Sequence, residues 1–81
     1  MNEIVEYIAK VLVTNPEDVK VITEINEGIV DIKLLVNADD MGKIIGKQGK
    51  IANSIRSILK ACAIKEQKKV NLVIDANNEQ N

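Results

Sequence analysis

The stretch that decides the fold is Gly42-Lys43-Ile44-Ile45-Gly46-Lys47-Gln48-Gly49-Lys50-Ile51-Ala52-Asn53-Ser54-Ile55-Arg56. At its centre, the loop Gly46-Lys47-Gln48-Gly49 separates a short helical turn from a longer helix. The two glycines allow a sharp bend and remove Cβ atoms where another backbone must come close. The free N–H groups and the positive dipole end of the following helix face this loop. Such a helix start is a ready site for an anion, most often a phosphate.

Basic and polar side chains surround this loop. Lys47 and Lys50 add positive charge on its rim, and Lys43 lies one turn earlier. Gln48 can hydrogen-bond a sugar or phosphate oxygen. A bare G-x-x-G pattern usually only lets two helices turn. The basic residues, the flanking isoleucines, a hairpin before the loop and a strand after it together favour an anion-binding loop.

Hydrophobic periodicity predicts an α+β fold with the order α-β-β-α-α-β. The expected elements are a helix at 3–13, strands at 19–25 and 29–36 joined by a turn at 26–28, a short helical turn before the loop, a helix at 50–64, and a strand at 70–75. A three-stranded mixed sheet with the second strand central and all helices on one face satisfies the apolar stripes. We expect one domain over residues 1–76 and a disordered tail at 77–81.

The pattern also predicts which side chains the fold buries. The apolar stripe of the helix at 50–64 is expected to comprise Ile51, Ala52, Ile55, Ile58, Leu59 and Cys62. The open face of the sheet would carry Ile22, Ile29, Leu35 and Val73, which offers a surface for a weak dimer contact. The segment 37–40, including Asp39 and Asp40, is expected to cap the short helical turn.

Composition restricts the class of protein. The chain of 81 residues suffices for one domain, contains no histidine, and has Cys62 as its one cysteine. Zinc sites need about four Cys or His ligands, so we expect neither a metal nor another cofactor. A lone thiol is typical of a reducing compartment. No signal peptide and no apolar run of roughly 20 residues is present, so we expect a soluble cytoplasmic protein.

The net charge of −1 hides a strong segregation of charge. Residues 1–40 hold nine acidic residues against three lysines, a balance of −6, whereas residues 41–69 hold eight basic residues against Glu66, a balance of +7. Binding of a polyanion responds to the local field more than to the total charge. The middle of the chain is therefore a basic module, although a solvated helix face would also produce such a run.

The run Ile44-Ile45-Gly46-Lys47-Gln48-Gly49-Lys50-x-Ala52-x-x-Ile55-Arg56 resembles the signature of the KH domain, a module that binds single-stranded nucleic acid. The predicted order of elements resembles the type II form of this domain. The opening Met1-x-Glu3-Ile4-Val5-x-Tyr7-Ile8 and the element Asn15-Pro16-Glu17-x-Val19 are similar to the small bacterial KhpA (YlqC-like) family. The resemblance covers almost the entire chain and leaves only the tail outside.

The resemblance implies a groove for about four nucleotides, with the loop and its two helices on one side. The strand around 70–74 would form the other side, with the turn at 26–28 nearby. The RNA-binding residues on this basis are Lys43, Ile45, Gly46, Lys47, Gln48, Gly49, Lys50 and Arg56. Ile44, Ile45, Ile51 and Ile55 are candidates for an apolar floor. Ile45 is the favoured base contact, whereas Ile51 and Ile55 fit core packing better.

The implied function is non-catalytic binding of single-stranded RNA, as an RNA chaperone or post-transcriptional regulator with a link to cell-wall synthesis and cell shape. The resemblance also implies a homodimer, or pairing with a larger Jag-like protein that has its own KH domain. The alternative is a protein-interaction or dimerisation module that pairs with such a partner.

Catalysis and nucleotide binding lack the residues that they need. An enzyme is disfavoured because Cys62 has no base partner and no other catalytic constellation is visible. A nucleotide-binding P-loop is also disfavoured. The spacing from Gly42 to Gly46 is one residue short, and Gln48 stands where Ser or Thr would bind magnesium.

Overall fold

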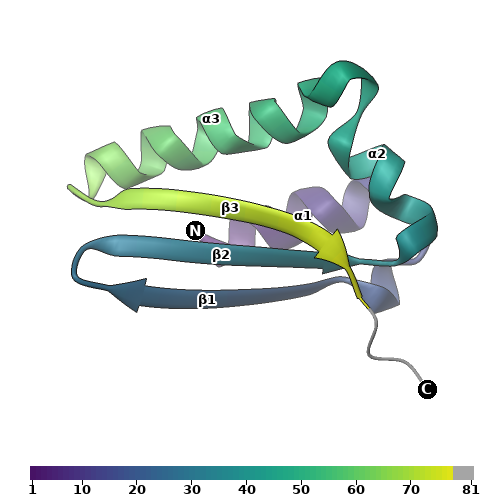
Figure 1. The fold of residues 1–81 in the computed structure, drawn as a ribbon, viewed down its shortest axis with the longest axis horizontal. Helices are drawn as coiled ribbons and strands as arrows, with labels where there is room; N and C mark the ends of the chain where they lie inside the picture. The colour runs from purple at the N-terminus through teal and green to yellow at the C-terminus, as the bar shows by residue number, and fades with distance from the viewer. Residues whose placement is uncertain (78–81) are drawn as a thin grey trace.

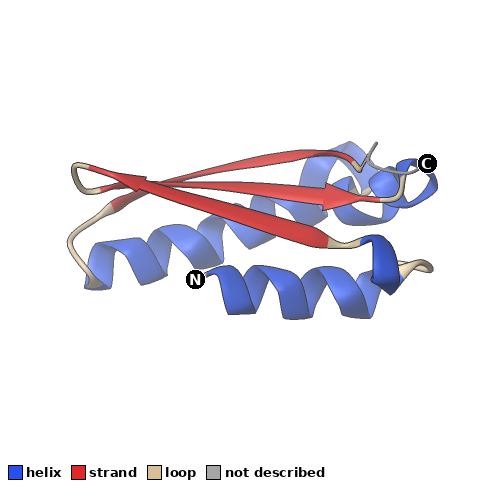
Figure 2. Cartoon of the chain, turned by 90° about the horizontal axis from the view of Figure 1, so that it is seen from below, coloured by secondary structure: helices blue, strands red, loops and turns tan. Residues whose placement is uncertain are grey.

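A three-stranded sheet forms one layer of the molecule and the helices form the other in the computed structural model, which describes residues 1–77 (Figures 1 and 2). The elements in chain order are α1 (Asn2–Leu12), η1 (Pro16–Asp18), β1 (Lys20–Asn26), β2 (Ile29–Val36), η2 (Ala38–Asp40), α2 (Met41–Ile45), η3 (Lys47–Gly49), α3 (Lys50–Lys65) and β3 (Lys69–Ala76), where η marks a 3₁₀ turn. The predicted α-β-β-α-α-β order is confirmed.

The sheet has the strand order β1-β2-β3, so the predicted central position of the second strand is confirmed. β1 pairs antiparallel with β2, and β3 pairs parallel with β2, with Val70 opposite Val30. Because successive side chains of a strand point to opposite faces, β2 buries every second residue under the helices. These are Val30, Ile32, Leu34 and Val36. Figure 2 shows that the helices cover only one face of the sheet.

The β1–β2 turn uses two residues with positive φ, Glu27 at 49° and Gly28 at 82°. Two-residue hairpin turns with positive φ at both positions match the right-handed twist of the strands that they join. The turn fixes the register, in which Asn26 pairs with Ile29 and Ile25 with Val30. The predicted turn at 26–28 is therefore confirmed within one residue.

The buried stripe of α3 differs from the predicted one. Its buried residues are Ala52, Ile55, Leu59 and Ala63, and Ile58 is 43% exposed. On a helix Ile58 lies about 100° around the axis from Leu59, so the two cannot both point at the sheet. The prediction that Ile58 belongs to the buried stripe is wrong. Cys62 is only half-buried.

β1 is largely exposed on both of its faces, and Val21 is its one half-buried residue. Ile25, on the face where the helices pack, is 60% exposed. Figure 1 shows the reason: α1 begins about midway along the sheet, so no part of it covers the hairpin end of β1. On the opposite face, Ile22, Ile29 and Val73 are exposed and Leu35 is half-buried, which confirms the predicted aliphatic side chains of the open face.

The segment before α2 contains one capping residue and one buried carboxylate. The side-chain oxygen of Asn37 accepts a hydrogen bond from the backbone N–H of Asp39 at 2.8 Å, which confirms the predicted cap for Asn37. Asp40 makes no side-chain cap to α2 and is fully buried, so its predicted capping role is wrong. Its carboxylate instead accepts hydrogen bonds from the loop that follows α1, at Thr14 and Asn15.

Asn77, the last described residue, is hydrogen-bonded to other parts of the fold. The backbone N–H of Asn77 donates to the carbonyl of Val36 at 2.7 Å, and its side-chain amide donates to the carbonyl of Asp18 at 2.9 Å. The rest of the predicted tail, residues 78–81, lies outside the described residues. None of the helices within residues 1–77 has the length and apolar character needed to cross a membrane.

Candidate nucleic-acid interface

The loop between α2 and α3 depends on three residues with positive φ. Gly46 has φ 77° and ψ 176°, a region that is essentially restricted to glycine. Gln48 (φ 57°) and Gly49 (φ 74°) are left-handed. The Gly46 N–H donates to the Gly42 carbonyl and the Gly49 N–H to the Gly46 carbonyl, at 2.9 and 3.2 Å. These bonds fix a tight bend, after which α3 starts at Lys50.

The two glycines of the loop are needed for different reasons. A Cβ built on Gly46 would lie 2.6 Å from Cγ1 of Ile51, so the side chain of the same polypeptide fills the space. A Cβ on Gly49 would meet nothing closer than the Asn53 side-chain amide nitrogen at 3.8 Å. Only the space beside Gly49 is therefore open to a ligand, whereas Gly46 is required by internal packing.

The polar side chains of the loop face solvent. Lys47, Gln48 and Lys50 are exposed. No side chain of the described chain caps the N-terminus of η3 or of α3, although the N–H of Lys50, the first residue of α3, donates to the Lys47 carbonyl. Uncapped amides beside two lysines form a positively polarised site suited to a phosphate oxygen.

The side chains that precede the loop differ in their availability. Ile45 is 37% exposed and borders the loop, whereas Ile44 is fully buried in the core. Ile44 therefore cannot line a groove, and its proposed part in an apolar floor is wrong. Ile55 is buried and Ile51 packs against the core, as expected. The ammonium nitrogen of Lys43 lies 3.7 Å from Oδ1 of Asp40, which offsets part of its charge.

Asp40 connects the start of α2 to the loop after α1 through a set of partly buried hydrogen bonds. The backbone N–H groups of Thr14 and Asn15 donate to its two oxygens at 3.1 and 3.0 Å, and the Asn15 side-chain amide donates at 3.1 Å. Burial alone would raise the pKa of Asp40. These hydrogen bonds and the charge of Lys43 together outweigh burial and hold the pKa below its ordinary value. The carboxylate therefore stays ionised and fixes the start of α2.

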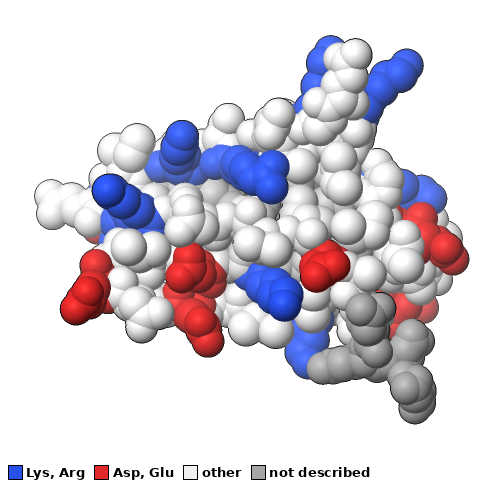
Figure 3. Space-filling model, viewed as in Figure 1, with Lys and Arg blue, Asp and Glu red and all other residues white. Residues whose placement is uncertain are grey.

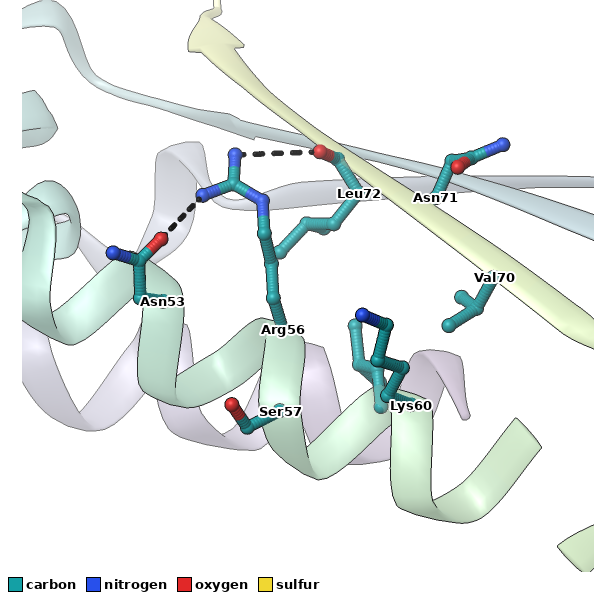
Figure 4. Close-up of a pocket in the computed structure, with 8 residues that line it drawn as sticks. Asn53, Arg56, Ser57, Lys60, Val70, Asn71 and Leu72 are labelled. Carbon is teal, nitrogen blue, oxygen red and sulfur yellow. Dashed lines mark hydrogen bonds between the residues drawn. The ribbon is translucent and has the colours of Figure 1, made fainter. Parts of the chain in front are cut away.

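A pocket of about 460 Å³ lies between α3 and β3, the helix and the strand that were expected to form the two sides of the groove (Figure 4). Its lining consists of Asn53, Arg56, Ser57, Leu59, Lys60, Val70, Asn71 and Leu72. Arg56 crosses the pocket: its Nη2 donates to the Leu72 carbonyl and its Nη1 to Oδ1 of Asn53, both at 3.4 Å. Both bonds are long, so the guanidinium is held only weakly.

Positive charge gathers around the loop and the pocket. Figure 3 shows Lys and Arg mainly over α3 and at the projecting α2–α3 junction, with Asp and Glu mainly over the lower half of this view. The segregation seen along the chain is therefore also visible on this face of the molecule. Among residues 1–77, no group of three His, Cys, Asp or Glu side chains comes together in a way that could hold a metal ion.

A family model described as "KhpA/KhpB, KH domain" matches residues 2–74, which is nearly the whole chain. The chain belongs to the KhpA/KhpB KH-domain family. Its three helices and mixed three-stranded sheet are those of the type II KH fold, as expected. The bend from Gly46 to Gly49 has the G-x-x-G spacing that the resemblance to this domain predicted.

Relatives in this family are similar over almost their full length. A protein named RNA-binding protein KhpA from Clostridium perfringens is 56% identical over 70 residues, which cover 86% of this chain and 93% of the relative. Proteins of the same name from Caldanaerobacter subterraneus subsp. tengcongensis and Borreliella burgdorferi are 50% and 42% identical. These alignments cover 86% and 89% of this chain and 93% and 88% of the relatives. No solved structure matches the chain.

The KH fold brings Lys43, Ile45, the G-x-x-G loop and Lys50 to one end of α3, and places Arg56 two turns further along. Sequence reasoning missed three residues that share the Arg56 pocket: Asn53, Lys60 and Asn71. Asn53 and Lys60 lie three and four residues from Arg56, a spacing that puts side chains on one helix face and could have identified them. The place of Asn71 beside the pocket depends on how β3 packs against α3, which the sequence pattern does not specify.

Proposed function

We propose that this chain is a non-catalytic protein that binds single-stranded RNA and grips the sugar-phosphate backbone with the loop Gly46–Gly49. The observation that carries the proposal is the exposed and uncapped start of α3 beside Lys47 and Lys50. The printed name of the relatives, RNA-binding protein, supports RNA as the ligand. The pocket at Arg56 extends the same surface toward β3.

The expected affinity of one domain is modest. Base stacking on aromatic side chains supplies roughly 1–3 kcal/mol per base in other single-strand binders. Here Tyr7 on α1 is the one aromatic residue of the chain. Binding must therefore depend on phosphate contacts at the loop and on polar contacts in the pocket.

The test is a charge reversal at the loop. The double variant Lys47→Asp, Gln48→Asp is expected to lose binding to a short single-stranded RNA, because like charge then faces phosphate. Fluorescence anisotropy measures the binding, and an unchanged circular dichroism spectrum shows that the fold is intact. The matched control is Asn2→Asp, Lys10→Asp on α1, which changes the net charge by the same amount. Wild-type binding by the loop variant would exclude the loop as the site.

Within this proposal, the chain acts in the cytoplasm as an RNA chaperone or post-transcriptional regulator. A half-buried lone thiol such as Cys62 is compatible with a reducing compartment. The matching test is crosslinking of the protein to RNA in cells followed by sequencing of the bound RNA. If the wild type recovers no more crosslinked RNA than the loop variant does, this role is contradicted.

A second candidate function is pairing with another KH domain, either a second copy or a larger Jag-like protein. The exposed aliphatic side chains of the open sheet face favour it, since Ile22 and Val73 line a shallow hollow of about 490 Å³ there. The description of the family model also joins two proteins, KhpA and KhpB. Pairing would raise apparent RNA affinity through avidity. Sedimentation velocity tests pairing between two copies. If the open sheet face forms the contact, the wild type should sediment as a dimer and the variant Ile22→Asp, Val73→Asp as a monomer.

A further inference from the structure

The pocket between α3 and β3 is rich in hydrogen-bond donors. Among the side chains that line it, Arg56 and Lys60 are cationic and none is acidic. The side-chain oxygen of Asn53 is occupied by Arg56, which leaves its amide group as a donor. Asn71 points away from Arg56, and its side-chain amide donates to Oδ1 of Asp31 on β2 at 3.0 Å, so it adds no donor to the pocket. The donors of Arg56, Lys60 and the Asn53 amide suit a ligand edge that consists of acceptors.

Arg56 is placed to contact such an edge. Its guanidinium projects from α3 toward the strand, between Asn53 and Leu72 (Figure 4). A guanidinium has five N–H donors in a planar fork, so donors remain while the two bonds of 3.4 Å persist. Those bonds are also long enough to be exchanged at low cost.

We propose that this pocket receives one base of the bound strand and that Arg56 makes it selective for guanine. This inference rests on the proposed function, because the G-x-x-G loop must hold the backbone while the base enters. Guanine presents O6 and N7 as two adjacent acceptors, and a bidentate contact from arginine is the commonest specific contact to it. Adenine presents N7 beside an amino donor, which would face a donor of Arg56 and leave both unsatisfied.

The pocket lies near the loop, so one strand can run from the loop into the pocket. Arg56 lies seven residues after Gly49, which is about 10 Å along the helix axis. Val70 and Leu72 of β3 supply an aliphatic surface on the other side of the pocket. Since the pocket contains no aromatic side chain, hydrogen bonds to the base edge are left as the source of selectivity.

The experiment compares short single-stranded RNAs of adenosine in which one position at a time is replaced. At one position, guanosine is expected to raise the affinity by about fivefold or more, the gain typical of one bidentate pair. Inosine, which keeps O6 and N7, should give the same gain, and 7-deazaguanosine, which lacks N7, should not. Three results would overturn the guanine assignment. These are equal affinities for adenosine and guanosine at every position, a higher affinity for cytidine than for guanosine, or a gain in affinity with 7-deazaguanosine as large as that with guanosine.

Variants assign the preference to Arg56. Arg56→Lys keeps the charge but loses the planar fork, so the ratio of guanosine to adenosine affinity should fall toward one. Lys33→Gln on the open sheet face removes a charge outside the pocket and should keep the ratio. A ratio that survives Arg56→Lys would overturn the role of Arg56. Failure of every oligonucleotide to bind the wild type would instead overturn the proposed function itself.

Discussion

Ile51 fills the space that a side chain on Gly46 would need. A Cβ on Gly46 would lie 2.6 Å from Cγ1 and 2.9 Å from Cβ of Ile51, closer than real side chains approach. Ile51 in turn packs against the core. The bend of the loop and the first turn of α3 are therefore packed as one unit, which keeps the start of α3 in a fixed direction.

This relationship predicts different effects of alanine at the two loop glycines. Gly46→Ala combines an overlap with Ile51 and a φ, ψ region suited only to glycine, so we expect a loss of about 2 kcal/mol or more in the free energy of unfolding. Gly49→Ala meets open space and should cost only about 1 kcal/mol, from its left-handed backbone. Urea unfolding measures both, and RNA binding under conditions where both variants are folded shows what each does to the site.

A double-variant cycle separates the two causes at Gly46. Ile51→Ala removes the overlapping atoms, so Gly46→Ala should cost less in that background than in the wild type. Equal costs in the two backgrounds would show that packing against Ile51 has no part in the effect.

The buried stripe of α3 predicts a contrast between neighbouring residues. Leu59→Ala removes a fully buried side chain and should lower the free energy of unfolding by about 2–5 kcal/mol. Ile58→Ala truncates a partly exposed side chain on a helix and should cost less than about 1 kcal/mol. Similar losses for both variants in urea unfolding would place the buried stripe where the sequence pattern had put it.

The lowered pKa of Asp40 predicts a pH dependence of stability. A carboxyl group whose pKa is lower in the folded than in the unfolded state stabilises the fold above the unfolded value, near pH 4, and this contribution falls as the pH drops through the folded pKa. Asp40→Asn should be less stable at pH 7 and should lose this part of the acid dependence. The control Asp39→Asn changes the same charge at an exposed neighbour. Parallel pH profiles for the wild type and Asp40→Asn in urea unfolding would contradict the assignment.

Salt dependence tests the number of phosphates that the loop contacts. If about three phosphates are neutralised, the logarithm of the association constant should fall with the logarithm of salt concentration with a slope of about −2. Lys47→Gln should reduce the magnitude of this slope by about 0.7, whereas Lys33→Gln on the open sheet face should leave it unchanged. A slope near zero for the wild type would mean that phosphate contacts do not dominate binding.

Short-range signals were sufficient for much of the fold. The loop Gly46–Gly49, the turn before Gly28 and the alternation along β2 each depend on residues that are close in the chain, so their conformations could be predicted. The position of the buried stripe around the axis of α3 could not be predicted from such signals. The small residues Ala52 and Ala63 allow α3 to approach the sheet along a line through Leu59, and a choice between Leu59 and Ile58 requires the position of the sheet.

The amino-acid sequence alone determined the order of elements, the G-x-x-G loop and the basic middle of the chain, because each arises from residue type and local spacing. The tertiary structure alone decided that Asp40 binds the loop after α1, that Ile51 occupies the space beside Gly46, and that Arg56 reaches the carbonyl of Leu72. The first and last of these join residues far apart in the sequence, and all three depend on how α2, α3 and β3 pack against one another. The conformational preferences of neighbouring residues do not determine contacts between different helices and strands.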